Sequence, residues 1–429
     1  MIYENWMRIH SLNMQTADCP PLRGNVKCEC LVIGGGFTGL HAALKLIESG
    51  KDVVLLEKGV CGGSSSGQSA GFLTPESEED MRQIITRYGQ EKAKVIYNIP
   101  LNGVKMIVNN AKRYKFNCDL RKQDSFYFAT IKRDIKHIKE EAEFREEEGL
   151  PYELFDKATL KNVHPGKNYR IGLKYPGSYG INPFSYCLEM KNLLLKKGVR
   201  IYENSEVLKI QENRAETHLG SVKADNILIC IDKLKKEIDE SMEKKYYHMQ
   251  TYLAISEPLN EKELKSVFPK EEMMCWDTKL IYIHYRIVEG NRILVGGSSV
   301  WATYSGRHLH NPRVIQRFID KLKDNFPGIK DVKFQYYWSG KLDITKDLVP
   351  VVDYDPKNKS IQYVIGCAGL NWAAYCGDYA ARRAINPKKA EDLSDFLGAG
   401  RESTFSKLSQ KLFGKKISFA VSNLKQLLG

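Results

Sequence analysis

The order of apolar and polar residues near the N-terminus predicts alternating strands and helices. The run 30–33 (CLVI) is short and apolar, which is typical of a buried parallel strand. Gly50 stands where the following helix should end, and the run 52–57 (DVVLLE) predicts a second buried strand. Between these strands, apolar residues recur at the spacing of one helix face: Leu40, Ala43, Leu44 and Ile47. The pattern therefore predicts a strand, a tight turn, a helix and a strand.

Two later stretches have different patterns. Residues 280–297 alternate between apolar and polar positions, which predicts a β-hairpin that turns at 289–291. Residues 131–149 are rich in Lys and Glu, and we interpret them as a solvated helix rather than as a functional charge cluster.

Composition limits the classes of protein that this chain can belong to. Its 429 residues are enough for two domains, and no apolar run is as long as a membrane span. The N-terminal segment lacks the apolar core of a secretory signal. The 10 cysteines are scattered without the paired spacing of a zinc site, so we expect reduced thiols, no metal and a cytoplasmic location.

The formal net charge of +13 increases attraction to anionic partners, but most of the basic residues are spread along the chain. The C-terminal residues 401–429 are the exception, because they combine basic residues with apolar residues at helical spacing. Such a segment can form a helix that lies on an anionic membrane. A terminal helix docked on the protein's own surface is the alternative, and we favour it.

The turn between the first two predicted strands carries the clearest chemical signal. Gly34, Gly36 and Gly39 form a G-x-G-x-x-G motif that permits a sharp turn, close approach of a pyrophosphate, and close helix–strand packing. The N-terminus of the helix then offers N–H groups to the phosphates. Glu57 stands at the distance expected for an acid that binds ribose hydroxyls. The Gly/Ser-rich loop 59–72 favours a flavin over a simple nicotinamide site.

Further motifs extend this signal along most of the chain, from about residue 25 to about residue 385. They are SGQSAGF (66–72), the proline-led stretch 181–210, NRILVGGSS (291–299), WSGKLDITKDLVPVVD (338–353) and VIGCAGLNWAA (364–374). With these motifs the chain resembles the FAD-dependent D-amino-acid-oxidase/glycine-oxidase superfamily, in particular its gamma-glutamylputrescine-oxidase-like branch.

The resemblance implies an α/β (α+β) fold in which a Rossmann-type FAD-binding domain is interleaved with an antiparallel-sheet substrate domain. The FAD-binding domain would comprise residues 1–80, 155–235 and 335–429. The substrate domain would comprise residues 81–154 and 236–334.

The resemblance also implies which residues contact FAD. They are Gly34, Gly36, Phe37, Thr38, Gly39, Glu57, Lys58, Ser66, Gly67, Gln68, Ser69, Val207, Gly340, Gly369, Leu370 and Asn371. Some relatives attach FAD covalently through a His in the loop that corresponds to residues 59–72, which we call the early loop. Gln68 stands at that place, so we expect non-covalent FAD.

The chain departs from the family pattern at several positions. Gln68 and Ser69 replace the usual Arg-Asn, and Leu370 and Asn371 replace a common His-Gly. Relatives that oxidise α-amino acids place an Arg soon after W-x-G, where this chain has Leu342. Because an α-carboxylate needs a charge-assisted partner, this change favours amines over amino acids.

Candidate catalytic residues lie on the predicted strand 281–286. Tyr282, His284 and Arg286 are two residues apart and share one face, whereas Tyr285 lies on the other. His284 could accept a proton near the flavin, or it could be a satisfied histidine within the sheet. Arg286 could hold a remote carboxylate or pair with an acid within the protein. Tryptophans could also wall an amine pocket, although packing is their more common role: Trp301 and Trp372.

The resemblance implies oxidation of a C–N bond in a small amine, by hydride transfer to FAD, imine hydrolysis, and reoxidation by O2 or another acceptor. Three alternatives stay open. The chain could oxidise glycine or D-amino acids, it could act on modified tRNA, or it could bind flavin without catalysis. The dispersed basic charge gives the tRNA interpretation little support, so we do not expect a nucleic-acid partner.

Overall fold

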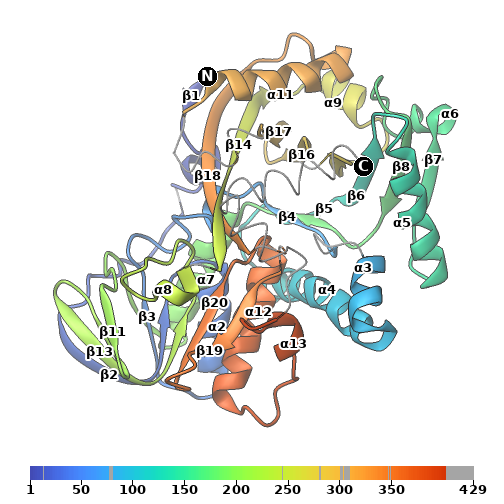
Figure 1. Ribbon diagram of the computed structural model, residues 1–429. Coiled ribbons are helices and arrows are strands. Elements are labelled where there is room, and N and C mark those ends of the chain that lie inside the picture. The colour runs from blue at the N-terminus through green and yellow to red at the C-terminus, as the bar shows by residue number, and fades with distance from the viewer. Residues whose placement is uncertain are drawn as a thin grey trace.

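The computed structural model describes residues 1–12, 14–76, 81–243, 245–279, 282–299, 303, 310–345, 347 and 349–401. Two large sheets organise this part of the chain, one of eight strands and one of nine (Figure 1). The mixed α/β architecture expected from the sequence is confirmed, and each sheet has its own hydrophobic core.

The eight-stranded sheet contains the predicted strand–turn–helix–strand unit. Its strands are, in order, β10 (Arg200–Tyr202), β3 (Val53–Leu56), β2 (Gly24–Ile33), β13 (Gly220–Ile229), β12 (Arg214–Glu216) and β11 (Lys209–Gln211). β20 (Ile361–Ile365) pairs with β13, and β19 (Val351–Tyr354) pairs with β20. The pairs β10/β3, β3/β2, β2/β13 and β13/β20 are all parallel, which is the arrangement of a Rossmann-type nucleotide-binding sheet.

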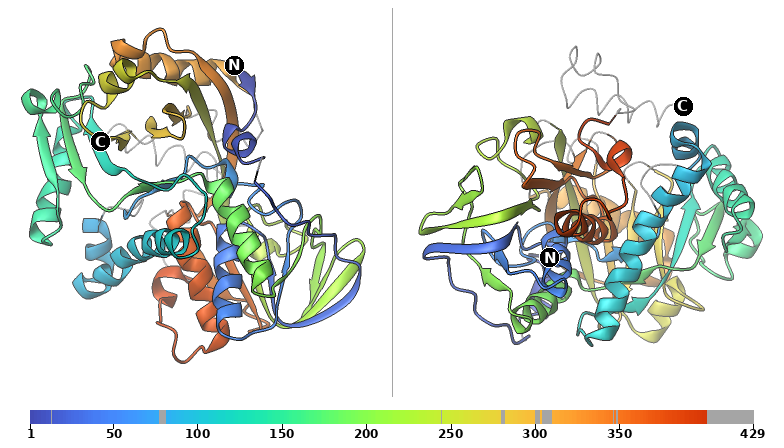
Figure 2. Two further views of the ribbon diagram at one scale, coloured as in Figure 1. Left: turned by 180° about the vertical axis from the view of Figure 1, so that it is seen from behind. Right: turned by 90° about the horizontal axis from the view of Figure 1, so that it is seen from below.

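Helices cover this sheet and supply much of its core. Figure 2 shows α2, α7 and α12 side by side against the strands, with α4 packed beyond α12. These helices are α2 (Phe37–Glu48), α4 (Gln90–Arg113), α7 (Pro183–Lys196) and α12 (Leu370–Ile385). Gly377 of α12 lies so close to the Thr38 carbonyl of α2 that a Cβ there would overlap it, so the two helix backbones are in direct contact.

The nine-stranded sheet is mostly antiparallel. Its order is β1 (Ile2–Tyr3), β18 (Phe334–Thr345), β14 (Tyr246–Pro258), β17 (Arg292–Gly297), β16 (His284–Val288), β15 (Met273–Asp277), β6 (Asp124–Ala129), β8 (Ile171–Tyr175) and β7 (Glu153–Asp156). We call the face that is covered by α11 (Pro312–Asn325) and α9 (Glu261–Val267) the outer face. The opposite, inner face is turned toward the eight-stranded sheet, as Figure 1 shows.

A small sheet of β4 (Phe72–Leu73), β9 (Tyr179–Gly180) and β5 (Arg121–Lys122) lies between the two large ones (Figure 1). The remaining elements are short, apart from α3 and α5. They are α1 (Trp6–His10), η1 (Ser66–Gln68), α3 (Met81–Tyr88), α5 (Ile135–Glu147), α6 (Lys157–Leu160), α8 (Glu240–Glu243), η2 (Pro327–Ile329) and α13 (Ser394–Leu397).

Two local predictions are confirmed. β16 and β17 form the expected antiparallel hairpin, and Gly290 (φ 72°) and Asn291 (φ 53°) make its turn in the left-handed region. α5 is the expected charged helix, but Arg145 on it is buried. This exception matters for the site described below.

The sheets divide the chain differently from the domain boundaries drawn from the sequence. β8 and all of β18 except its first residue lie within segments assigned to the FAD-binding domain, and β7 crosses the predicted boundary between residues 154 and 155, yet all three strands pair in the nine-stranded sheet. Conversely, α4 was assigned to the substrate domain, yet it packs in the core of the eight-stranded sheet. The chain crosses between the two units more often than motif spacing suggested.

In the part of the chain that the structure describes, no helix is long and apolar enough to cross a membrane. The basic C-terminal tail lies outside the described residues from 402 onward. All 10 cysteines are free, and Cys28 and Cys30 belong to different hydrophobic cores.

Candidate active site

The glycine turn between β2 and α2 is built by backbone contacts that leave no room for side chains. Gly34 has a φ of +108°, and a Cβ on it would overlap the carbonyl oxygen of Cys230. A Cβ on Gly39 would overlap the carbonyl oxygen of Gly34. Both glycines are therefore required by the tight turn and by close packing of the helix on the strand, as the motif predicts.

Glu57, directly after β3, lies across this turn. One carboxylate oxygen accepts the Gly35 N–H at 2.8 Å and the other accepts the Gly59 N–H at 2.8 Å. Burial raises the pKa of Glu57, and the two N–H groups oppose that rise. Each oxygen retains lone-pair capacity, so the carboxylate can also accept hydrogen bonds from ribose hydroxyls.

The early loop comes back over the N-terminus of α2. The Ser66 hydroxyl accepts the N–H of Phe37 at 3.1 Å, which places Ser66 beside the first turn of the helix. The side chains of Phe37 and Thr38 are buried, so these residues can offer a ligand only backbone groups. Backbone N–H groups at a helix N-terminus are what a pyrophosphate requires.

Contacts from distant segments hold the loop around Gln68. The indole N–H of Trp338 donates to the carbonyl of Gln68 at 3.1 Å, and the Asn5 amide donates to the carbonyl of Gly67 at 2.9 Å. A Cβ on Gly340 would lie 3.4 Å from that of Gln68, so these two predicted residues are neighbours. Ser69 follows at the end of η1.

The start of α12 is the third part of the candidate FAD site. We call this site the cradle; its other two parts are the glycine turn 34–39 with Glu57 and the loop 59–72. Gly369 precedes the helix with a φ of +105°, and Leu370 and Asn371 are buried in the first turn. The Asn371 amide donates to the carbonyl of Thr74 at 2.7 Å, which joins α12 to the segment after β4. Asn371 is therefore fixed by the fold, and it also contacts Gly103 of α4.

The two remaining predicted cofactor-binding residues differ in exposure. Val207 is buried between β10 and β11, and Lys58 is exposed next to Glu57. In the described part of the chain, no group of three or more His, Cys, Asp or Glu side chains is arranged to hold a metal ion.

The inner face of the nine-stranded sheet opposes this cradle. Cross-strand register puts a row of directly opposed residues on that face: Trp338, Leu253, Gly296, His284, Trp276, Tyr127 and Leu173. Trp338 at one end of the row donates to Gln68 of the early loop. The row therefore faces the cradle, and its central residues are aromatic.

His284 lies in the middle of this row. Gly296 is its neighbour on β17, and a Cβ there would overlap the His284 imidazole. Phe72 packs edge-on against the ring at a centroid distance of 5.3 Å. The buried Nδ1 of His284 has no hydrogen-bond partner among the residues that the structure describes. Burial lowers the pKa of His284 to about 4, so the imidazole is neutral at physiological pH.

Comparison with known proteins decides the family. The model of the DAO family, described as FAD dependent oxidoreductase, matches residues 29–383 of the chain. The chain belongs to this family. It is therefore an FAD-dependent oxidoreductase that acts on C–N bonds of amines or amino acids.

Individual relatives agree with this assignment. Gamma-glutamylputrescine oxidoreductase of Escherichia coli and a probable oxidoreductase, OrdL, of Haemophilus influenzae are each 27% identical to the chain. In both comparisons 81% of this chain and 81% of the relative are covered. The crystal structure of glycine oxidase from Geobacillus kaustophilus has the same fold, with a TM-score of 0.76 at 16% identity, over 88% of this chain and 100% of the other.

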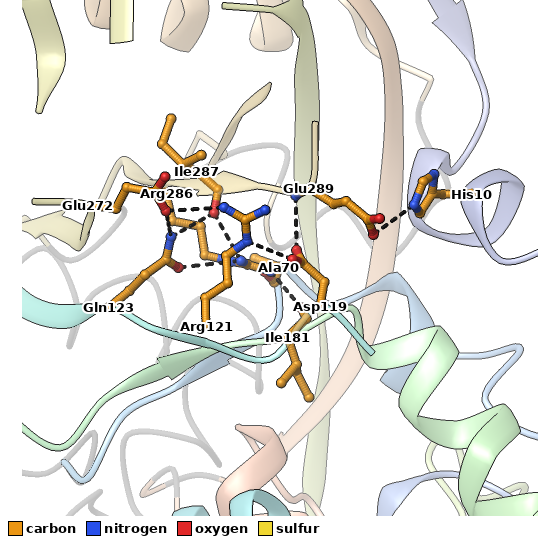
Figure 3. Close-up of polar contacts among 10 residues, drawn as sticks. All are labelled: His10, Ala70, Asp119, Arg121, Gln123, Ile181, Glu272, Arg286, Ile287 and Glu289. Carbon is orange, nitrogen blue, oxygen red and sulfur yellow. Dashed lines mark hydrogen bonds and ion pairs between the residues drawn. The ribbon is translucent and has the colours of Figure 1, made fainter. Parts of the chain in front are cut away.

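Within the DAO-family framework, Arg286 has a position that the sequence did not indicate. Its buried guanidinium donates to the carbonyl oxygens of Ala70, at 2.9 Å, and of Ile181 (Figure 3). It also donates to the carbonyl of Ile287 and contacts the Gln123 amide oxygen. These contacts tie the inner face to the end of the early loop. They favour a positioning role over binding of a substrate carboxylate.

Ion pairs extend this network toward the N-terminus. Arg121 pairs with Asp119 and with Glu272, and Glu272 also accepts from the Gln123 amide, as Figure 3 shows. Glu289, at the hairpin turn, pairs with His10 of α1 at 2.7 Å. The nine-stranded sheet, the small sheet and the N-terminal helix are thereby connected by polar contacts.

The other candidates have different surroundings. Tyr282 lies just before β16, with its ring 5.5 Å from that of His284, so these two residues are together. Tyr285 lies on the outer face, as predicted. Trp372 packs against Phe396 within the core, and Trp301 lies outside the described residues. Leu342 packs with Ile344 and Ala368, so an apolar side chain stands where amino-acid-oxidising relatives have an Arg.

Sequence reasoning missed Phe72 and Trp276, which lie beside His284, and the buried pair Glu76 and Arg145. Phe72 ends a quoted motif, so its position next to the glycine loop was a usable signal. Arg145 is one of many charged residues in its helix, and nothing in the local pattern distinguishes it. Only strand register brings Trp276 beside His284.

Proposed function

We propose that this DAO-family enzyme binds FAD non-covalently and oxidises the C–N bond of a small amine. The supporting observation is the chemistry of the inner face, which is aromatic around a neutral His284 and apolar at Leu342. Two buried arginines lie nearby, and each already has partners: Arg286 on backbone carbonyls and Arg145 on Glu141. Neither is free to bind an α-carboxylate as its principal ligand.

The residues of the cradle have separate tasks in this proposal. Ser66 and the first turn of α2 hold the pyrophosphate, and Glu57 binds the adenosine ribose. Bound FAD supplies a hydride acceptor for the carbon beside the substrate nitrogen, after which the imine hydrolyses in water. Phe72 and Trp276 exclude water from the reacting carbon, since both present aromatic rings on the inner face.

His284 orients the amine. Its unpartnered Nδ1 can accept a hydrogen bond from the substrate N–H, which fixes the nitrogen lone pair relative to the C–H bond that breaks. A neutral imidazole does not repel a cationic substrate during entry. We further propose O2 or another small acceptor for the electrons, and a cytoplasmic location, which the 10 free cysteines support.

An anaerobic titration tests this function. Purified yellow holoenzyme is mixed with gamma-glutamylputrescine, putrescine, N-methyl amines, glycine or D-alanine, and the visible flavin band is followed. We expect amines to bleach the band and amino acids to leave it. Recolouring in air then identifies O2 as an acceptor.

Amino-acid oxidation is the second candidate, because glycine oxidase of Bacillus licheniformis is 22% identical over 87% of this chain. Bleaching by glycine or D-alanine alone would replace the amine proposal with this one. A yellow protein that no small compound bleaches would contradict both.

A further inference from the structure

Glu76 is a buried acid that the proposed mechanism does not use. It follows β4 in the chain, and both of its carboxylate oxygens are inaccessible to solvent and lack a hydrogen-bond partner among the described residues. Among the described residues, Arg145 of α5 forms an ion pair with it, with a guanidinium nitrogen 3.8 Å from a carboxylate oxygen. A buried carboxylate without hydrogen-bond donors is costly in free energy, and a ligand that supplies donors would offset that cost.

Arg145 does not fully neutralise Glu76, because its guanidinium also pairs with a second carboxylate. Its guanidinium donates to Glu141 on the same helix at 2.9 Å and stacks on the ring of Tyr175, 3.6 Å from the centroid. Two carboxylates therefore face one guanidinium. When Glu76 is ionised, the group carries one surplus negative charge inside an aromatic enclosure.

Aromatic rings connect this acid to His284. The Tyr175 ring lies 6.3 Å from that of Trp276, and the Trp276 ring lies 6.4 Å from that of Phe72. Phe72 in turn contacts His284. Aromatic side chains thus lie between two unpartnered polar groups, the His284 Nδ1 on the inner face and the Glu76 carboxylate on the segment after β4.

The same segment of chain ties this acid to the cradle. Phe72 and Glu76 lie on either side of Thr74, whose carbonyl is held by Asn371 at the start of α12. The acid is therefore fixed with respect to the residues that we assign to FAD.

We propose that Glu76 binds a second ammonium group of the substrate while the reacting nitrogen lies beside His284. This inference rests on the proposed amine oxidation. An ammonium group supplies the donors that the bare carboxylate oxygens lack, and it is attracted to the faces of Tyr175 and Trp276. The substrate class is then a diamine, or an amine with a cationic group at its far end.

The titration of Glu76 is consistent with this role. Burial raises its pKa to about 7, while Arg145 and the Thr74 hydroxyl oppose the rise and Glu141 adds to it. Tyr97 of α4 also faces the group. A bound ammonium would favour the ionised carboxylate, so ligand binding at neutral pH should release protons.

The test compares two ligands of equal carbon chain length on the intact holoenzyme. Putrescine and n-butylamine are titrated anaerobically, and each dissociation constant is taken from the change in the visible flavin spectrum. We expect putrescine to bind at least about tenfold more tightly, because a hydrogen-bonded charge pair in a buried site is worth that much. In Glu76→Gln the ratio of the two constants should fall toward one.

Glu140→Gln is the matched control, since Glu140 is a partly exposed acid on the same helix as Arg145 and pairs only with surface groups. It should keep the wild-type ratio. Equal binding of the two ligands to the wild type, or the same ratio in Glu76→Gln, would overturn the inference. If putrescine binds selectively but never bleaches the flavin, the proposed function fails while the Glu76 site stands. If n-butylamine bleaches as well as putrescine, the function stands and the site fails.

Discussion

The glycine turn and the inner face of the nine-stranded sheet are both buried, yet their polar groups are satisfied in different ways. At the turn, both oxygens of Glu57 accept backbone N–H groups and Ser66 covers the N–H of Phe37. On the inner face and the segment after β4, the Nδ1 of His284 and the Glu76 carboxylate lack such partners. The polar groups of the first region are paired largely with the chain's own backbone, whereas the second region leaves hydrogen-bond acceptors unpaired for a ligand.

The outer face of the same sheet supports this distinction. Tyr285 is the neighbour of His284 on β16, but its hydroxyl is hydrogen-bonded to both His164 and Tyr169. His164 also bonds to the carbonyl of Val267 at 2.8 Å. Burial alone therefore does not separate a structural residue from a functional one, and the missing partner is the informative observation.

The largest effect is expected at the turn. In Gly39→Ala the new Cβ would overlap the Gly34 carbonyl oxygen, so α2 would be pushed away from β2. We expect loss of FAD, with affinity reduced about a hundredfold or more, as a fall of about 3 kcal/mol implies. The absorbance of the purified protein near the visible flavin maximum measures FAD content.

Gly400→Ala is the control for this substitution, because a Cβ at Gly400 meets nothing within 4 Å. It should stay yellow. A yellow, fully loaded Gly39→Ala protein would show that the turn is more yielding than the backbone contacts indicate.

The second prediction concerns Arg286, which joins the two regions. Arg286→Met leaves the carbonyls of Ala70 and Ile181 without their donor, so we expect the free energy of unfolding to fall by about 3 kcal/mol. The early loop, which contains Ala70, should also shift and alter the visible flavin spectrum. Arg286→Lys should restore the wild-type spectrum in part. Denaturant unfolding and absorbance spectra measure both effects.

Arg317→Met, at an exposed position on α11, is the matched control and should change stability by less than about 0.5 kcal/mol. If Arg286→Met matched this control in stability and spectrum, a positioning role for Arg286 would be excluded.

The third prediction uses pH to compare the wild type with His284→Phe. Burial lowers the pKa of His284 from 6.5 to about 4, so between these values the unfolded chain binds more protons than the folded one. Stability from this residue is present above pH 6.5 and is lost as pH falls toward 4, with about 2 kcal/mol gone at pH 5. His284→Phe removes that loss. Denaturant unfolding at pH 5 and pH 7.5 measures the difference.

His137→Phe, at an exposed position on α5, removes no buried imidazole and serves as the control. His164 should still contribute acid sensitivity in both variants, because burial lowers its pKa to about 3. An unchanged pH dependence in His284→Phe would mean that the imidazole is solvated in solution.

The smallest effect is expected at Leu342. Leu342→Arg places a guanidinium where amino-acid-oxidising relatives carry one, so anaerobic flavin reduction by glycine or D-alanine should rise about tenfold. Leu342→Met keeps the position apolar and should not raise it. If Leu342→Arg gains nothing, the absence of this Arg does not support the preference for amines that we propose.

Much of the FAD-binding site could be predicted from the sequence, because its shape depends on residues that are close together in the chain. The strand, turn and helix around Gly34 and Gly39 follow from apolar periodicity and from the steric needs of a tight turn. The hairpin at Gly290 and the helix that begins at Pro183 are confirmed for the same reason. Sheet and core membership could not be read in this way, since β18 pairs in the nine-stranded sheet and α4 packs in the core of the eight-stranded sheet through contacts with distant segments.

The sequence by itself determined that the chain holds a dinucleotide cradle, since each glycine acts on its immediate backbone neighbours. Only the tertiary structure decided which side chains face that cradle. Tyr127 is far in the chain from Trp276 and His284 and meets them through strand register, and Glu76 meets Arg145 through packing of α5 on the sheet. Register and packing depend on contacts between distant segments, whereas a glycine motif depends on the few residues around it.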